Sequence, residues 1–363
     1  MVNDYGDWPA EHVALRQSAG VLDFSFRSRL CLTGADRVRF LHGQVTNDVK
    51  KLRVGEGCYA ALVTARGKME SDLNIFCLAD ELLLDFEPGL TEKISRRLEK
   101  FIVADDVQVV DVAPHYGLLS VQGPKAEDVV HAIGLIGRDA LPRVQADQQV
   151  GPTIVKISDA TLGEIYLTNS SRLGASGFDL FVPNDSLGAV ADKLMAAAKQ
   201  IGGRACGWQA FETARVEAGI PRFSVDMDET NLPLECGIES RAVSYHKGCY
   251  IGQEVINRIH SFGHVTKELR GLRLAGDLKS LPQRGDKLFH AGKEIGYVTS
   301  AVKSPTLNAL VAPKLQSEGG NIALGYVRRE ANQIGTELVL QTAVGESAAK
   351  IVEIPFMGGL PCR

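Results

Sequence analysis

The sequence predicts an α+β protein whose C-terminal part is a small antiparallel β-barrel. With 363 residues, 45% of them hydrophobic, the chain is long enough for two or three modules, each with an ample core. Segments with helical periodicity alternate with hairpin-like strands and not with a repeated βαβ unit. Beyond residue 268 the chain consists of short apolar runs separated by Gly and Pro, a texture typical of a small barrel.

The first third of the chain carries clear local signals. The segment from Pro9 to Ser18 is predicted as a helix, because Pro9 suits a first helical turn. Residues 29–33 are expected to form a strand, and Asp36 is expected to cap the helix that follows. Residues 58–88 contain three apolar stretches separated by turn residues, which predicts an antiparallel meander. A further helix is expected to open at Thr91.

A second α+β unit of the same kind is predicted over residues 116–202. It ends in a helix that Asp185 is expected to cap and that Gly202 and Gly203 terminate. The two halves suggest pseudo-related subdomains, although no residue-level repeat proves the relationship.

We therefore expect two domains, the first divided into two subdomains. The expected bounds are 1–267 for the first domain, with subdomains of roughly 1–115 and 116–267, and 268–357 for the barrel. Residues 304–320 are the best candidate for a long mobile loop.

Charge and composition exclude several classes of protein. The formal net charge is -4, so no global positive field attracts nucleic acid, and direct tRNA binding is not expected. The N-terminal segment has no continuous apolar core, so we expect no signal peptide, no membrane span and a cytoplasmic location. The seven cysteines are scattered without a CxxC pair, which predicts reduced thiols, no metal site and no iron–sulfur cluster.

Cys249 is the strongest candidate for a reactive residue. It follows His246 and Lys247 and precedes a short segment with helical spacing. A thiol at a helix entrance beside cations is stabilised as the thiolate, which would make it nucleophilic or redox-active. Gly248 and Gly252 would let the backbone turn sharply and approach a ligand. The alternative is that Cys249 is a buried turn residue and that Lys247 pairs with a surface carboxylate.

The segment around Cys249 also carries a specific signature, K-G-C-Y-x-G-Q-E. It consists of Lys247, Gly248, Cys249, Tyr250, Gly252, Gln253 and Glu254. Together with R-x-E-A-G at 215–219 and P-x-E-x-G at 233–237, it resembles the YgfZ family of folate-binding proteins, relatives of the glycine-cleavage aminomethyltransferases. Further similarities at both ends extend the resemblance over nearly the whole chain. The resemblance implies a three-subdomain cloverleaf around a central folate-binding hole, with tetrahydrofolate or a one-carbon derivative as cofactor.

Two departures from the aminomethyltransferase pattern affect the expected activity. Ala175 stands where those enzymes carry a glutamate that meets the pterin ring, and the strand-end Asn-Ala pair followed by an aspartate is replaced by a segment reading Asp85-Phe86-Glu87. On this basis a working glycine-cleavage subunit is not expected.

Seven residues are candidates for folate contacts, because pterins stack on aromatic rings and bind amide-like partners while the glutamate tail attracts cations. They are Asn47, Asp179, Trp208, Phe211, Arg215, Glu217 and Arg258. The aromatic residues could instead belong to the core, and Arg215 with Glu217 could form an internal strut. Glu254 could orient the loop or pair with Arg258 one helical turn later.

The resemblance implies a tetrahydrofolate-binding accessory protein for iron–sulfur cluster assembly or repair that affects tRNA modification indirectly, with Cys249 as the functional thiol. Its partners would be folate and iron–sulfur assembly proteins or client enzymes. The alternative is a folate-dependent aminomethyltransferase or methyltransferase. A third class, a folate-binding regulator that performs no chemistry, also stays open.

Overall fold

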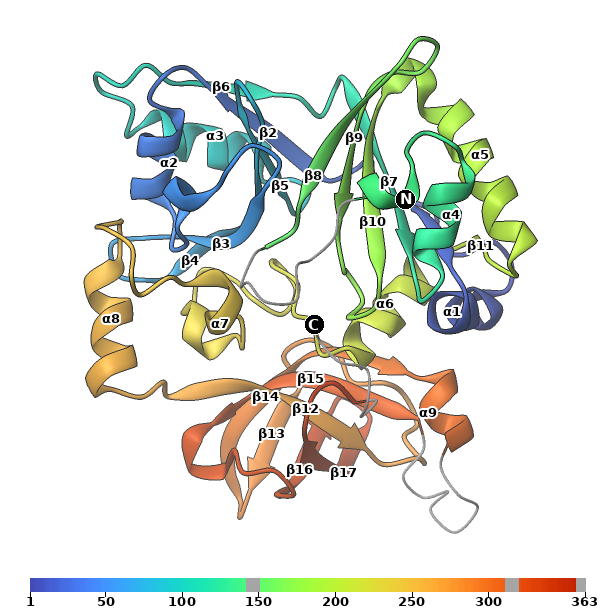
Figure 1. The fold of residues 1–363 in the computed structure, drawn as a ribbon. Helices are drawn as coiled ribbons and strands as arrows, with labels where there is room; N and C mark the ends of the chain where they lie inside the picture. The colour runs from blue at the N-terminus through green and yellow to red at the C-terminus, as the bar shows by residue number, and fades with distance from the viewer. Residues whose placement is uncertain (142–150, 311–319, 357–363) are drawn as a thin grey trace.

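The computed structural model describes residues 1–141, 151–310 and 320–356, which fold as three units (Figure 1). Two units are sheets covered by helices, and the third is a closed six-stranded antiparallel barrel. The expected α+β class, with three subdomains and a C-terminal barrel, is confirmed.

The first unit is a five-stranded antiparallel sheet in the order β3-β4-β5-β2-β6. Its strands are β2 (Ser28–Thr33), β3 (Gly57–Val63), β4 (Met69–Cys77), β5 (Leu82–Phe86) and β6 (Gln108–Asp111). Helices α2 (Arg37–Gln44) and α3 (Thr91–Glu99) cover it, and their buried Leu41 and Leu98 join one apolar cluster with the strands. The 3-10 turn η1 (Val49–Lys51) follows α2.

The second unit is a six-stranded sheet in the order β11-β1-β7-β10-β9-β8. Its strands are β1 (Gly20–Asp23), β7 (Tyr116–Gln122), β8 (Ile154–Asp159), β9 (Gly163–Asn169), β10 (Gly177–Pro183) and β11 (Arg204–Ala205). Its helical elements are α1 (Trp8–Gln17), α4 (Ala126–Ala132), η2 (Arg138–Ala140), η3 (Asn184–Ser186) and α5 (Leu187–Gln200).

Strand β1 does not follow the expected division of the chain near residue 115. It pairs antiparallel with β7 and parallel with β11, so it lies inside the second sheet although it precedes the whole first sheet in the sequence. Helix α1 packs against α6 (Trp208–Glu217) on the same side of the molecule (Figure 1). The N-terminal segment therefore belongs to the second unit.

A connecting segment joins the sheets to the barrel. Its elements are α6, η4 (Pro233–Glu235), α7 (Glu239–Ala242) and α8 (Gln253–Phe262). The barrel strands are β12 (Lys267–Leu274), β13 (Lys287–His290), β14 (Lys293–Lys303), β15 (Asn321–Arg328), β16 (Glu337–Thr342) and β17 (Gly345–Val352), accompanied by α9 (Pro305–Leu310) and η6 (Arg329–Ala331). Figure 1 shows α6 between the second sheet and the barrel, and α8 at the outer edge below the first sheet.

The expected capping residues are wrong in two places. The Asp36 side chain makes no capping bond, because it accepts from the Asp106 amide and from Arg39 instead. Asp185 lies inside η3, so α5 begins one position after Ser186. Part of the expected mobile loop 304–320 lies outside the described residues, and its first part forms α9.

Candidate functional site

The signature loop is fastened to the C-terminal end of α2. The Lys247 Nζ donates to the carbonyl oxygens of His42, Val45 and Asn47 at 2.5, 2.6 and 2.9 Å. The last carbonyls of a helix lack intrahelical partners, and the buried ammonium satisfies that of His42 together with the two carbonyls just after the helix. On the other side of the loop, the Ile251 amide donates to the Gly43 carbonyl at 3.2 Å. Cys249 therefore lies between two residues, Lys247 and Ile251, that are both bound to the last turn of α2.

Cys249 itself is exposed, which contradicts the alternative of a buried turn residue. The thiol also lies neither at a helix entrance nor beside a free cation, in contrast to the prediction from the sequence. Helix α8 begins at Gln253, four residues after the thiol, and the Lys247 ammonium is committed to the three carbonyls. Burial lowers the pKa of Lys247 to about 8, so the ammonium stays largely charged at neutral pH.

The other signature residues shape the loop. Gly252 has φ +86°, and a Cβ there would lie 2.5 Å from the Thr64 carbonyl oxygen, so only glycine fits. Tyr250 is buried, and the Gln253 side chain donates to the Gly248 carbonyl at 3.5 Å. Glu254 is exposed. The expected helical pair of Glu254 with Arg258 is not among the ion pairs of the described residues.

The two candidate aromatic residues lie together on α6. Trp208 and Phe211 have ring centroids 5.3 Å apart, and both pack against Phe24. Phe211 is buried in the core, whereas Trp208 is partly exposed and carries the Arg222 guanidinium 4.6 Å above its ring. Only Trp208 thus presents an aromatic surface next to polar groups.

The polar candidates are mostly engaged by protein groups. The Asn47 side chain donates to the carbonyls of Tyr59 and Arg241, at 2.8 and 2.9 Å. Buried Glu217 pairs with His12 and Arg16 and also accepts from Ser304. These contacts fasten distant segments to one another.

Arg215 and Asp179 are both buried, and each forms ion pairs with other residues. Arg215 donates to Asp226 and Glu212, both at 2.7 Å, and Asp179 lies 2.6 Å from Arg172. The structure thus gives Arg215 the contacts of an internal strut. Exposed Arg258 lies on α8, away from these groups. The roles of the seven candidates in folate binding remain predictions.

Asp72 is a candidate that the sequence did not single out. It lies in β4, its Oδ2 accepts from the Tyr59 hydroxyl at 2.8 Å, and its buried Oδ1 has no hydrogen-bond partner among the described residues. Burial, followed by the nearby Glu87 carboxylate, raises the pKa of Asp72 above its usual value. An acid in an alternating strand usually faces solvent, so the sequence gave no signal for this environment.

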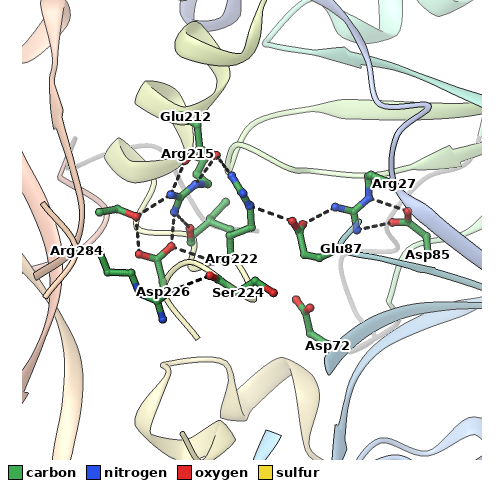
Figure 2. Close-up of polar contacts among 12 residues, drawn as sticks. Arg27, Asp72, Asp85, Glu87, Glu212, Arg215, Arg222, Ser224, Asp226 and Arg284 are labelled. Carbon is green, nitrogen blue, oxygen red and sulfur yellow. Dashed lines mark hydrogen bonds and ion pairs between the residues drawn. The ribbon is translucent and has the colours of Figure 1, made fainter. Parts of the chain in front are cut away.

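A chain of ion pairs, extended to the barrel by hydrogen bonds from two hydroxyl groups, runs beside Asp72 and joins all three units (Figure 2). Glu87 lies 2.6 Å from Arg27 and 3.0 Å from Arg222, and Arg222 continues to Glu212. Asp85 pairs with Arg27 and with Arg172, and so extends the chain to the second sheet. Asp226 pairs with Arg215 and accepts hydrogen bonds from Thr299 and Ser300 of β14, and so extends the chain to the barrel. In Figure 2 the Asp72 carboxylate points toward the part of the cluster that holds Glu87.

Comparison with known proteins defines the family. The GCVT N-terminal domain matches residues 3–247, and the glycine cleavage T-protein C-terminal barrel domain matches residues 267–313. The chain belongs to the glycine cleavage T-protein superfamily. A tetrahydrofolate cofactor, as expected from the sequence, is consistent with membership of this superfamily.

Relatives within the superfamily cover nearly the whole chain. An aminomethyltransferase of Halalkalibacterium halodurans is 28% identical over 98% of this chain and 93% of its own length. One from Geobacillus sp. WCH70 is 26% identical over 97% and 93%. The fold matches the glycine cleavage system aminomethyltransferase T of Bartonella henselae, with a TM-score of 0.82 and 23% identity over 98% of this chain and 91% of that one.

These relatives overturn the expected iron–sulfur accessory function. Both are named aminomethyltransferases and align along nearly their full length. Within the described residues, no group of three or more His, Cys, Asp or Glu side chains could hold a metal ion. The described helices include none that is long and apolar enough to cross a membrane.

Proposed function

We propose that this protein is a folate-dependent aminomethyltransferase, which exchanges a one-carbon unit between an aminomethyl donor and tetrahydrofolate. The superfamily membership and the two aminomethyltransferase relatives support this reaction class. The observation that carries the proposal is Asp72, a carboxyl group with a raised pKa and one buried oxygen without a partner among the described residues.

Asp72 and Trp208, which are linked through Glu87 and Arg222, offer groups that suit a pterin ring. A pterin offers an aromatic face and amide-like hydrogen-bonding edges. Trp208 supplies a partly exposed aromatic surface covered by Arg222, and the free Oδ1 of Asp72 supplies a polar contact. Tetrahydrofolate, when bound, supplies the amine nitrogens that accept the one-carbon unit.

Hydrogen bonding places the acidic proton of Asp72 on one oxygen. The Tyr59 hydroxyl donates to Oδ2, so a proton on the carboxyl group belongs on Oδ1, the buried oxygen that has no hydrogen-bond partner among the described residues. A carboxyl group whose pKa is raised holds its proton to a higher pH than an ordinary aspartate does, which suits a general acid for the amine that leaves the donor. Burial, followed by the negative charge of Glu87, favours the protonated form of Asp72.

Within the superfamily we place the chain in the YgfZ branch. This finer assignment is supported by the complete K-G-C-Y-x-G-Q-E signature at residues 247–254. Two signature residues have a structural role in the loop. Lys247 fastens it to α2, and Gly252 permits its left-handed turn.

The test combines tetrahydrofolate binding with turnover. Calorimetric titration should show saturable binding to the parent protein and to Asp72→Asn. Turnover is followed in the reverse direction. Methylenetetrahydrofolate, ammonia and a thiol, supplied as dithiothreitol, then give tetrahydrofolate and the aminomethylated thiol. We expect Asp72→Asn to bind tetrahydrofolate within a few fold of the parent and to lose turnover by about 100-fold or more, because it has no acidic proton.

The matched control is Glu70→Gln, which alters an acid on the same strand that pairs with Arg97. It should retain turnover. Absence of tetrahydrofolate binding by the parent would refute the cofactor, and full turnover by Asp72→Asn would refute the role of its proton.

A further inference from the structure

The tyrosine that contacts Asp72 is held in place by a side chain of another segment. The Asn47 Nδ2 donates to the Tyr59 carbonyl at 2.8 Å and to the Arg241 carbonyl at 2.9 Å. The Asn47 Oδ1 accepts from the Asp48 amide at 2.8 Å. Both polar atoms of the Asn47 side chain therefore bind protein backbone, and the amide joins β3 to α7.

This junction brings a cation onto the ring of Tyr59. The Arg241 guanidinium lies 4.5 Å from the ring centroid. Thr46 strengthens the junction, because its hydroxyl donates to the Ala242 carbonyl at 2.6 Å and accepts from the Ala61 amide at 2.9 Å. Arg241 is exposed, and no acid among the described residues forms an ion pair with it. Its charge is therefore not neutralised by a neighbouring carboxylate.

The hydroxyl of Tyr59 decides which oxygen of Asp72 carries the proton. A tyrosine hydroxyl can donate or accept. If it donates to Oδ2, the proton belongs on Oδ1, whereas a hydroxyl that accepts would place the proton on Oδ2. A cation over the ring draws electron density from the phenol, which makes the hydroxyl a better donor and a poorer acceptor. Arg241 therefore favours the proton on Oδ1, the oxygen that has no partner among the described residues.

We propose that Asn47 and Arg241 are positioning residues that act through Tyr59 and keep the Asp72 proton on Oδ1. The use of this proton rests on the proposed function, but its placement can be measured without turnover.

Three other groups act on the Asp72 carboxyl group. Glu87 raises its pKa and Arg27 lowers it. Cys236, which also lies near Tyr59, is neutral because burial raises the pKa of its thiol to about 12. Of all these groups, Tyr59 is the one whose side chain forms a hydrogen bond with the carboxyl group.

The test is an infrared titration of the full chain, in which the band of protonated Asp72 is the one that Asp72→Asn removes. A carboxyl group absorbs at lower frequency when its C=O oxygen accepts a hydrogen bond than when that oxygen is free. We expect the lower frequency in the parent, because Oδ2 is then the C=O oxygen and accepts from Tyr59. In Tyr59→Phe the band should move to higher frequency. The midpoint of its pH titration should rise by about one unit, because the lost hydrogen bond lowers the pKa of Asp72.

Variants of the two positioning residues should give the same signature in smaller size. Arg241→Met should move the band to higher frequency and raise the midpoint by about half a unit, which corresponds to an exposed cation–π contact. Arg241→Lys keeps a cation near the ring and should restore both values. Asn47→Ala should resemble Arg241→Met. Arg66→Met, which removes the same charge from an exposed arginine of the β3–β4 turn, should change neither value.

Three results would overturn the proposal. They are the absence of a band that Asp72→Asn removes, a parent band at the frequency of a free C=O group, and equal bands and midpoints in Arg241→Met and the parent. Failure of the proposed function would appear elsewhere, as full turnover by Asp72→Asn.

Discussion

At the scale of single residues, the site depends on environment more than on residue type. Asp72, Glu87 and Asp85 are all acids of the first sheet, yet their surroundings assign them different states. Asp72 keeps an oxygen free of protein partners, and its pKa is raised. Asp85 is buried too, but its ion pairs with Arg27 and Arg172 outweigh burial and hold its pKa well below the usual range. Composition cannot reveal this difference, because it arises from residues that meet only in the fold.

The two glycines of the signature loop should respond differently to the same substitution. Gly252→Ala forces a left-handed backbone and brings Cβ within 2.5 Å of the Thr64 carbonyl oxygen, so we expect a loss of about 3 kcal/mol in unfolding free energy. Gly248→Ala meets only ordinary contact and should change stability by less than about 1 kcal/mol. Urea denaturation of both variants measures the difference, and similar losses would contradict the assigned role of Gly252.

At the scale of elements, local signals predicted what is locally determined. The helices at α1 and α3, the meander β3-β4-β5 and the barrel follow from periodicity and turn residues. The sharp turn at Gly252 was also accessible from the sequence, whereas the exposure of Cys249 came only from the structure. The attachment of the signature loop was not predictable, because Lys247 binds carbonyls some 200 positions away and no spacing rule connects them.

The attachment can be tested by removing one ammonium. Lys247→Met leaves three carbonyls in and just after the last turn of α2 without their buried donor, so we expect a loss of about 3 kcal/mol in unfolding free energy and faster hydrogen exchange of the loop amides. Lys51→Met is the control, because Lys51 is exposed and its 3.5 Å pair with Asp48 contributes little. Unchanged exchange across residues 246–252 in Lys247→Met would show that the loop is held by other contacts.

At the scale of the whole molecule, the ion-pair chain from the second sheet to the barrel links units that have separate cores. Asp85 is its central acid in the first unit, in contact with Arg27 and Arg172. The sequence showed these charges but not the chain, since its members come from β5, the segment before β2, the β9–β10 loop and α6. Asp85, Arg215 and Asp226 are buried, so removal of one partner leaves a buried charge unpaired.

The pH dependence of stability should report this chain. Because the pKa of Asp85 is lower in the folded state, its contribution is present above the unfolded pKa near 3.9 and is lost as the pH falls below it. We expect that contribution to shrink by about 1 kcal/mol between pH 5 and pH 3.

Asp85→Asn should lower stability at pH 7 by about 3 kcal/mol, and its deficit relative to the parent should narrow toward pH 3. Urea unfolding at several pH values measures this, with the exposed Asp185→Asn as control. A deficit that stays constant from pH 7 to pH 3 would contradict the assigned ionisation.

The placement of β1 also has a consequence for biosynthesis. Residues 20–23 leave the ribosome before the entire first sheet, yet their partners in β7 and β11 end with Ala205. At typical elongation rates the strand waits about ten to forty seconds for β11 to be made. During this interval a short apolar segment is attached to a nascent chain without its final neighbours, so β1 is made before the first sheet but reaches its native position after it.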